Sequence, residues 1–386
     1  MTAHLTPDRG ALLLRRAIST AVLSAGFALT GVGTVLPGIL LPLFSEKWGL
    51  RDDGAGLLLF LQFSGSSLGA LFSGLNRIRS MSLGYALLVV SSLDLVFDHL
   101  RTPFAVFFFF GLGLGMAMTS TSLLVSDRSG ENRAAKLEWL NFTWSIGATS
   151  CPLLLLPLVH RDDIHQVYLS LFAVFFLVLA WVVAAERETK PAIAAVASGA
   201  EPRPISRLFL LLLICAVCTV GVESALTGWL TTYSHRTGMQ SLAGSALATA
   251  VFWLGEILSR LAFSTPLLKK IGRQTVLRLG IWGLTATAIF LIAAPHPWTI
   301  IAGAGVAGIF TGPLYPIQLS YLLERSARGW FFAVAGLGAA FFPWITGLVS
   351  AHLNSLRLGL LVPCCGASVM LVLTALIFEP AQTENL

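Results

Sequence analysis

One acidic residue stands alone in a long apolar stretch in the second half of the chain. Glu223 is the only charged residue between Leu208 and Tyr233. A charge at the centre of a membrane-spanning helix costs roughly 2.5–3.5 kcal/mol on insertion scales, so such a residue is expected to face a cavity. A carboxyl group there could take up and release a proton. Glu223 is therefore our candidate for proton exchange, and the alternative is a glutamate that only bonds to a neighbouring helix.

A second acidic residue, Asp94, lies in the apolar stretch 81–97. It falls near the end of that stretch, where water or the lipid headgroups are within reach. We expect a solvated or helix-packing role for Asp94, and we rank it below Glu223.

Polar and aromatic residues near the middle of other apolar stretches could form a binding site. Amide groups and flat aromatic faces suit a sugar ring, which offers hydroxyl groups around an apolar C–H face. Tryptophan and tyrosine also occur at membrane interfaces, so some of these residues are expected to lie elsewhere. The candidates, besides Glu223, are Gln62, Asn141, Trp144, Trp253, Tyr315, Gln318 and Trp344.

Charged residues close several apolar stretches and could form a gate. Glu256 and Arg260 are four residues apart, so on a helix they share one face and can pair with each other or with a neighbouring helix. Ion pairs that form in one conformation and separate in another can hold one side of a protein closed. The alternative is static anchoring at the headgroup level. The predicted gate residues are Asp127, Arg128, Glu256, Arg260, Glu324 and Arg325.

The elements that position these residues must be membrane-spanning helices. The 386 residues are 55% hydrophobic and only 11% charged, with a mean hydropathy of +0.80. A spanning helix needs about 20 mostly apolar residues, and irregular backbone cannot face lipid. The sequence predicts an all-α membrane protein with twelve transmembrane helices, at 17–44, 54–75, 81–97, 104–125, 137–159, 167–184, 208–233, 242–268, 276–294, 298–322, 330–349 and 358–378.

Most of the 25 Lys and Arg residues fall on one side of this topology. Basic residues gather in cytoplasmic loops, so we expect both termini in the cytoplasm and a location in the bacterial inner membrane. The bias also accounts for the net charge of +6 without a nucleic-acid partner. Membrane lipid is the expected surrounding.

The longest polar stretch lies near the middle and divides the chain. We predict an N-terminal six-helix bundle at 1–185, a cytoplasmic linker at 186–207 and a C-terminal six-helix bundle at 208–386. The halves also repeat, because glycines recur at a nearly constant offset. The pairs are Gly31 with Gly221, Gly65 with Gly255, and Gly147 with Gly338. Parallel repeats of this kind predict two pseudo-symmetric bundles.

Several of these motifs resemble those of a known transporter family, and the resemblance extends over nearly the whole chain. The stretch from Gly221 through Glu223 to Trp229 and Tyr233 resembles a helix of the fucose, galactose and glucose:proton symporter branch of the major facilitator superfamily. Phe252-Trp253-Leu254-Gly255 with Arg260 resembles the next helix of that branch, and Gly338 with Pro343-Trp344 resembles a later one. The resemblance implies a sugar-like substrate, alternating access and a working monomer.

The chain departs from that branch at its acidic positions. The branch places acidic residues in its first and fourth helices, and here 17–44 and 104–125 contain none. Coupling through those helices is therefore not carried over, and Glu223 remains as the candidate. The coupling ion is expected to be a proton, with sodium as the alternative.

Other chemistries find little support in the sequence. The five cysteines all fall within predicted helices, so we expect free, buried thiols and no redox loop. No histidine spacing predicts a metal site, and no phosphate-binding loop or catalytic constellation is present. We therefore expect no cofactor, no metal and no enzyme activity.

Three functions remain open. The first is import of a monosaccharide or related polyol, either ion-coupled or as an uncoupled facilitator. The second is export of an apolar or amphipathic compound such as a drug or lipid. The third is a role outside transport, as a receptor or membrane enzyme.

Overall fold

The chain folds almost entirely into α-helices. The computed structural model describes residues 9–73, 76–97, 103–129, 133–159, 164–188, 206–238, 241–264, 271–325 and 330–378, and within these ranges it contains no strand. The helices of the first half are α1 (Arg9–Lys47), α2 (Asp52–Phe72), α3 (Arg77–Phe97), α4 (Pro103–Arg128), α5 (Arg133–Val159) and α6 (Ile164–Glu188). Those of the second half are α7 (Arg207–Arg236), α8 (Leu242–Ser264), α10 (Arg273–Ala293), α11 (Pro297–Thr311), α12 (Leu314–Arg325), α13 (Trp330–Leu353), α14 (Leu356–Gly359) and α15 (Leu361–Ile377).

The predicted twelve-helix membrane fold is confirmed. Eleven described helical stretches are long and apolar enough to cross a membrane, and α5 is a further long helix of 27 residues. Helices α11 and α12 together make one crossing, as do α14 and α15. Large apolar side chains such as Leu177, Trp282 and Val372 lie on the outside of the protein, where a lipid-facing surface requires them.

The break between α11 and α12 has a cause in the sequence. Pro313 and Pro316 lack an N–H group, so the carbonyls four residues earlier lose their helical donors. One of these is the carbonyl of Gly312, which lies in the break itself. This leaves a backbone acceptor available inside the second half.

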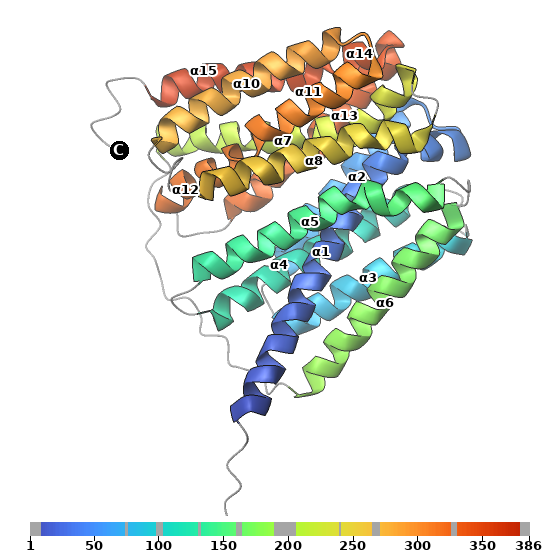
Figure 1. The fold of residues 1–386 in the computed structure, drawn as a ribbon, viewed down its shortest axis with the longest axis vertical. Helices are drawn as coiled ribbons and strands as arrows, with labels where there is room; N and C mark the ends of the chain where they lie inside the picture. Colours follow the sequence, from blue (N-terminus) through green and yellow to red (C-terminus); the bar gives the residue numbers. More distant parts are fainter. Residues whose placement is uncertain are drawn as a thin grey trace, which may run out of the picture.

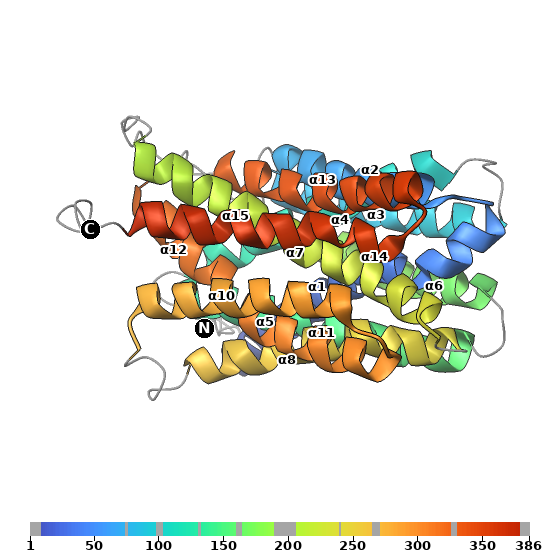
Figure 2. The ribbon, with the colours of Figure 1, turned by 90° about the horizontal axis from the view of Figure 1, so that it is seen from above.

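The helices gather into two groups that follow the order of the chain (Figure 1). In the first half α2 packs on α4, α3 packs on α4 and α6, and α1 packs on α5. In the second half α7 packs on α13 and α15, and α8 packs on α11. The two groups meet where α2 contacts α13, where α5 contacts α8 and where α1 contacts α7. Figure 2 shows α2 and α13 running side by side.

The glycine repeat corresponds to equivalent helix crossings. A Cβ atom added to Gly147 of α5 would collide with the carbonyl oxygen of Ala28 in α1. A Cβ atom added to Gly338 of α13 would collide with the carbonyl oxygen of Val217 in α7. Contact between α1 and α5 in one half is therefore matched by contact between α7 and α13 in the other. The missing side chains let the backbones approach closely.

The expectation of buried thiols is correct for three of the five cysteines. Cys151, Cys215 and Cys218 are buried, whereas Cys364 is partly exposed and Cys365 is exposed. Both of these belong to α15, which lies at the edge of the second half, so one side of that helix is left uncovered by neighbours.

The predicted division into two domains and a linker stays a prediction. Helix α6 continues to Glu188 and α7 begins at Arg207, while most of the predicted linker lies outside the described residues. The same holds for the ends of the chain before residue 9 and after residue 378.

We predict that Gly338→Ala lowers the thermal stability of the purified protein in detergent. The added methyl group must push α13 away from Val217, and overpacking of this kind costs about 1–3 kcal/mol. Gly272→Ala is the matched control, because no atom lies within 4 Å of a Cβ at that position. Equal melting temperatures for the two variants would contradict the close crossing of α7 and α13.

Candidate functional site

The helices begin and end at two opposite sides of the molecule (Figure 2). The side at which α6 ends and α7 begins is called the linker side, and the side at which α1 ends and α2 begins is called the far side. On the sequence prediction, the linker side is cytoplasmic. Helices α7 and α8 run in opposite directions between the two sides.

Glu223 lies in the middle of α7, which contacts α1 of the first half and α8, α12 and α13 of the second half. From Gly221 to Ser234 every residue of α7 is buried except Glu223, which is partly exposed. Glu223 therefore belongs to an enclosed segment of the helix and not to a lipid-facing one. The described residues provide no hydrogen bond or ion pair to its carboxylate.

Charged residues of α8 act on Glu223. Glu256 and Arg260 both interact electrostatically with it, and Tyr315 of α12 is also within electrostatic reach. Glu256 is completely buried and forms an ion pair with Arg260, four residues later. The centre of the protein thus holds two carboxyl groups and one guanidinium group.

The Arg260 side chain joins three helical elements. Its Nη2 pairs with Glu256, its Nε donates to the carbonyl oxygen of Gly312 at 3.2 Å, and its Nη1 donates to Oγ of Ser145 at 2.9 Å. Pro316 frees the Gly312 carbonyl, because it cannot donate the helical bond to that oxygen. Ser145 belongs to α5 in the first half. Arg260 therefore links the two halves near the middle of the protein.

Two predicted tryptophans meet across the same helix pair. Trp144 of α5 and Trp253 of α8 pack edge to face, with ring centroids 5.3 Å apart. Trp253 is only 3% exposed, and the indole N–H groups of both residues are buried without a hydrogen-bond acceptor among the described residues. Buried donors normally have partners, so these two are available to a ligand.

The two predicted glutamines are buried, and in each the side-chain nitrogen has a hydrogen-bond partner while the side-chain oxygen has none among the described residues. Gln318 of α12 donates to Oγ1 of Thr219 at 2.8 Å, and Gln62 of α2 donates to the carbonyl oxygen of Thr34 at 3.1 Å. The side-chain oxygens of both glutamines lack a donor among the described residues. Gln318 is tied to α7 through Thr219, one turn from Glu223.

The remaining predicted site residues lie elsewhere. Trp344 of α13 packs against Phe60 of α2, with ring centroids 5.0 Å apart, and belongs to the contact between α2 and α13. Asn141 is exposed on α5, one turn closer to the linker side than Ser145. Asp94 is partly exposed in α3, a helix that packs within the first half. The structure does not bring these three to the Arg260 cluster.

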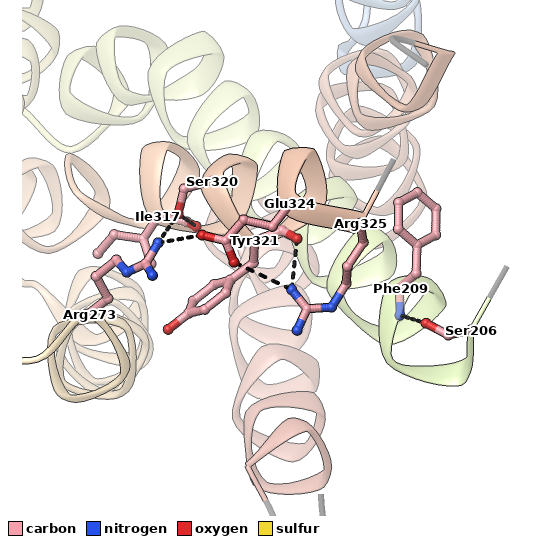
Figure 3. A network of polar contacts seen from close by, with 8 residues as sticks. All are labelled: Ser206, Phe209, Arg273, Ile317, Ser320, Tyr321, Glu324 and Arg325. Carbon is pink, nitrogen blue, oxygen red and sulfur yellow. Dashed lines mark hydrogen bonds and ion pairs between the residues drawn. The ribbon is translucent and has the colours of Figure 1, made fainter. Parts of the chain in front are cut away.

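The predicted gate residues at the linker side pair within their own halves. Asp127 pairs with Arg77 in the first half, and Arg128 is exposed beside it at the end of α4. In the second half Glu324 accepts a hydrogen bond from Arg273 at 2.9 Å and lies 3.8 Å from Arg325 (Figure 3). Arg273 also lies over the ring of Tyr321 (Figure 3). These contacts tie α3 to α4 and α10 to α12, and their role as a gate stays a prediction.

The far side carries a link that the sequence did not reveal. Asp52, the first residue of α2, accepts two hydrogen bonds from Arg236 at the end of α7, at 2.6 and 2.8 Å. It also accepts one from Oγ of Ser350 in α13 at 2.5 Å, and Arg51 donates to the carbonyl oxygen of Ala351 at 3.1 Å. We call Asp52, Arg236 and Ser350 the far-side clamp, since they join the two halves there.

The first and second halves also meet closely below this clamp. A Cβ atom on Gly38 of α1 would lie 2.9 Å from Cα of Gly228 in α7. Residues 35–41 of α1 and 224–234 of α7 are buried throughout. The far side is therefore closed in this structure.

Comparison with known proteins identifies the class. The model of the Major Facilitator Superfamily matches residues 21–280, and the chain belongs to this superfamily. It is accordingly a membrane transporter and not an enzyme. No curated protein sequence matches the chain.

Solved transporter structures share the fold at low sequence identity. A variant of the E. coli fucose:proton symporter FucP matches with a TM-score of 0.62 and 16% identity, over 94% of this chain and 99% of that chain. FucP in an outward conformation gives 0.63 and 16%, with the same coverage. A variant of the nucleoside transporter NupG gives 0.69 and 14%, again over 94% and 99%. The predicted resemblance to the fucose symporter is confirmed at the level of fold.

We predict that Asp52→Asn opens the far side. The variant loses the charge that holds Arg236, and each 1.4 kcal/mol lost from the closed state changes the ratio of states about tenfold. A cysteine at Thr232, which is buried below the clamp, should then react severalfold faster with a thiol reagent that cannot cross the membrane.

Asp53→Asn is the matched control, since among the described residues that carboxylate accepts a hydrogen bond only from the adjacent Gly54 N–H. Both variants would be prepared in a background without the native cysteines. Unchanged labelling in Asp52→Asn would show that the clamp does not hold the far side closed.

Proposed function

We propose that this protein moves a small polyhydroxylated solute, a monosaccharide or related polyol, by alternating access coupled to a proton at Glu223. The observation that carries the proposal is the placement of Glu223. It is the one accessible residue in an otherwise buried segment of α7, and its carboxylate has no partner among the described residues. A carboxyl group in that position suits binding and release of a small cation.

The chemistry around Glu223 supports a solute with hydroxyl groups. Trp144 and Trp253 offer apolar ring edges together with two unpaired N–H donors, and Gln318 offers an unpaired acceptor. A sugar presents both an apolar C–H face and hydroxyl groups that donate and accept. The matching solved structures are named as a fucose:proton symporter and a nucleoside transporter, which agrees with this choice.

The proposal also gives the driving force for solute accumulation and the side to which this conformation is open. One proton falling through 100 mV supplies about 2.3 kcal/mol, which corresponds to roughly fifty-fold accumulation. With the linker side in the cytoplasm of a bacterial inner membrane, the closed far side would make this an inward-facing state of a monomer. Export of an apolar compound is the competing function, and it predicts transport that does not respond to any sugar.

We predict that an effective sugar drives proton uptake into liposomes that hold the wild-type protein, and that Glu223→Gln abolishes it. The amide keeps the shape of the side chain but cannot exchange a proton. Sugar exchange between equal concentrations should persist in the variant, because exchange needs no net proton movement. The measurement uses a panel of hexoses, deoxyhexoses and polyols.

Glu138→Gln is a control for this experiment, since Glu138 is an exposed carboxylate on α5. Proton uptake that survives in Glu223→Gln would refute coupling through this residue. No uptake and no exchange with any sugar in the wild type would refute the sugar proposal and favour export.

We predict that Trp253→Phe weakens solute binding about three- to ten-fold. The phenyl ring retains the aromatic contact with Trp144 but removes the buried N–H donor, and one hydrogen bond contributes about 0.5–1.5 kcal/mol. Trp298→Phe is the matched control, because Trp298 is 69% exposed. Equal affinities in both variants, measured by calorimetry with a sugar active in the uptake assay, would exclude the Trp253 indole from the site.

A further inference from the structure

Among the described residues, Arg260 is the one cation that acts on both Glu223 and Glu256. Glu256 is completely buried in α8 and pairs with Arg260, whereas Glu223 is partly exposed in α7 and lacks an ion pair among the described residues. Both carboxyl groups lie within electrostatic reach of each other and of Arg260. The charge of this cluster therefore changes by one unit when Glu223 gains or loses a proton.

Other titratable groups on the helices packed against α7 and α8 do not alter this count. On α5 the described ones are Lys136 and Glu138, which are exposed toward the linker side, and Glu324 and Arg325 lie at the linker-side end of α12. Helix α12 contributes Tyr315, a hydroxyl group that carries no charge near neutral pH. In the described part of α1 the ionisable side chains are Glu46 and Lys47 at the far side, and in α13 the described one is His352, also near the far side. Helix α15 contributes Cys364 and Cys365.

The guanidinium group is held by three different elements. Its three nitrogens contact Glu256 in its own helix, the Gly312 carbonyl at the helix break, and Ser145 in the opposite half. The contact with Glu256 is ionic and the contact with Gly312 uses an acceptor that Pro316 has freed. The contacts with Gly312 and Ser145 are hydrogen bonds to neutral acceptors, which a second carboxylate can outcompete. Of these two, the bond to Ser145 is the one that joins α8 to the first half.

We propose that Arg260 is the positioning residue that couples the charge on Glu223 to the contact between the two halves. With Glu223 protonated, Arg260 stays between Glu256 and Ser145, and α8 is tied to α5 as in this structure. When Glu223 releases its proton to water, two carboxylates attract one guanidinium, Arg260 leaves Ser145 for Glu223, and the tie between α5 and α8 is lost. This inference rests on the proposed proton exchange at Glu223.

The first test follows the distance between α5 and α8 by electron spin resonance. Spin labels replace Trp139 of α5 and Leu258 of α8, which are 53% exposed and lie toward the linker side. The labelled protein lacks the native cysteines and is measured in lipid at low and high pH. The wild type should show one distance distribution at low pH and a longer or broader one at high pH.

Three variants separate the steps of the proposal. Glu223→Gln should keep the low-pH distribution at every pH, since its side chain cannot ionise. Ser145→Ala should show the high-pH distribution at every pH, since Arg260 has no partner on α5. Ser150→Ala should behave as the wild type, because its hydroxyl group bonds to Gly147 of the same helix. A wild-type pH response in Ser145→Ala would overturn the proposal.

The second test measures transport and allows for misfolding of a single charge deletion. Arg260→Gln alone leaves Glu256 buried without a counterion, so the double variant Glu256→Gln with Arg260→Gln is used, which removes both charges. Solute exchange should persist in the double variant, while proton-driven accumulation falls at least tenfold. Arg260→Lys should show the same loss of accumulation, because lysine cannot contact three elements with one planar group.

The two proposals fail in different ways. Absence of solute-driven proton uptake in the wild type refutes the proposed function at Glu223. Proton uptake in the wild type that is retained in Arg260→Lys and in the double variant leaves that function intact and refutes the role of Arg260.

Discussion

A polar group inside a membrane protein must find its partners within the protein, and the Arg260 cluster is arranged by this constraint. A buried carboxylate such as Glu256 needs a counterion. Arg260 supplies the counterion, and its other nitrogens are satisfied by Gly312 and Ser145. The helix break between α11 and α12 contributes to this arrangement, because Pro316 leaves the Gly312 carbonyl without its helical donor. The break between α11 and α12 thus supplies a hydrogen-bond acceptor to Arg260 of α8.

The same constraint explains which parts of the structure could be predicted from the sequence. Twelve apolar stretches and their repeat follow from chain length and composition, since lipid allows few alternatives to a helix. The glycine offset predicted a repeat of the two halves. The structure adds that the paired Gly147 and Gly338 lie at equivalent crossings, where a missing side chain lets the backbones approach. The pairing of Glu256 with Arg260 also follows from their spacing on one helix.

The contacts between helices were harder to predict. Ser145 has no feature that distinguishes it from other hydroxyl residues, and its bond to Arg260 depends on how α5 and α8 are rotated toward each other. Asp52 resembles an ordinary loop residue in the sequence, yet three hydrogen bonds from α7 and α13 end on its carboxylate. Trp344 packs against Phe60 of α2, a partner that nothing in the sequence indicated. Residue type and period give the helix, whereas its rotation comes from tertiary packing.

The contacts that join the two halves differ in strength, and this difference matters for a protein that must open on alternate sides. The Arg236 side chain of the far-side clamp is 44% exposed, so solvent screens its ion pair with Asp52 and keeps the link weak enough to break. The Gly38–Gly228 crossing has no polar partner to lose, and it can separate or slide at the cost of packing alone. The bond between Arg260 and Ser145 is less exposed, because the Arg260 side chain is 28% exposed and Ser145 is buried. Under the proposed coupling, a change of one charge at Glu223 acts on the contact that solvent screens less, while the more exposed clamp at the far side breaks at a lower cost. This difference favours a transport cycle in which the protonation of Glu223 selects the conformation, and the far-side clamp forms or breaks in response.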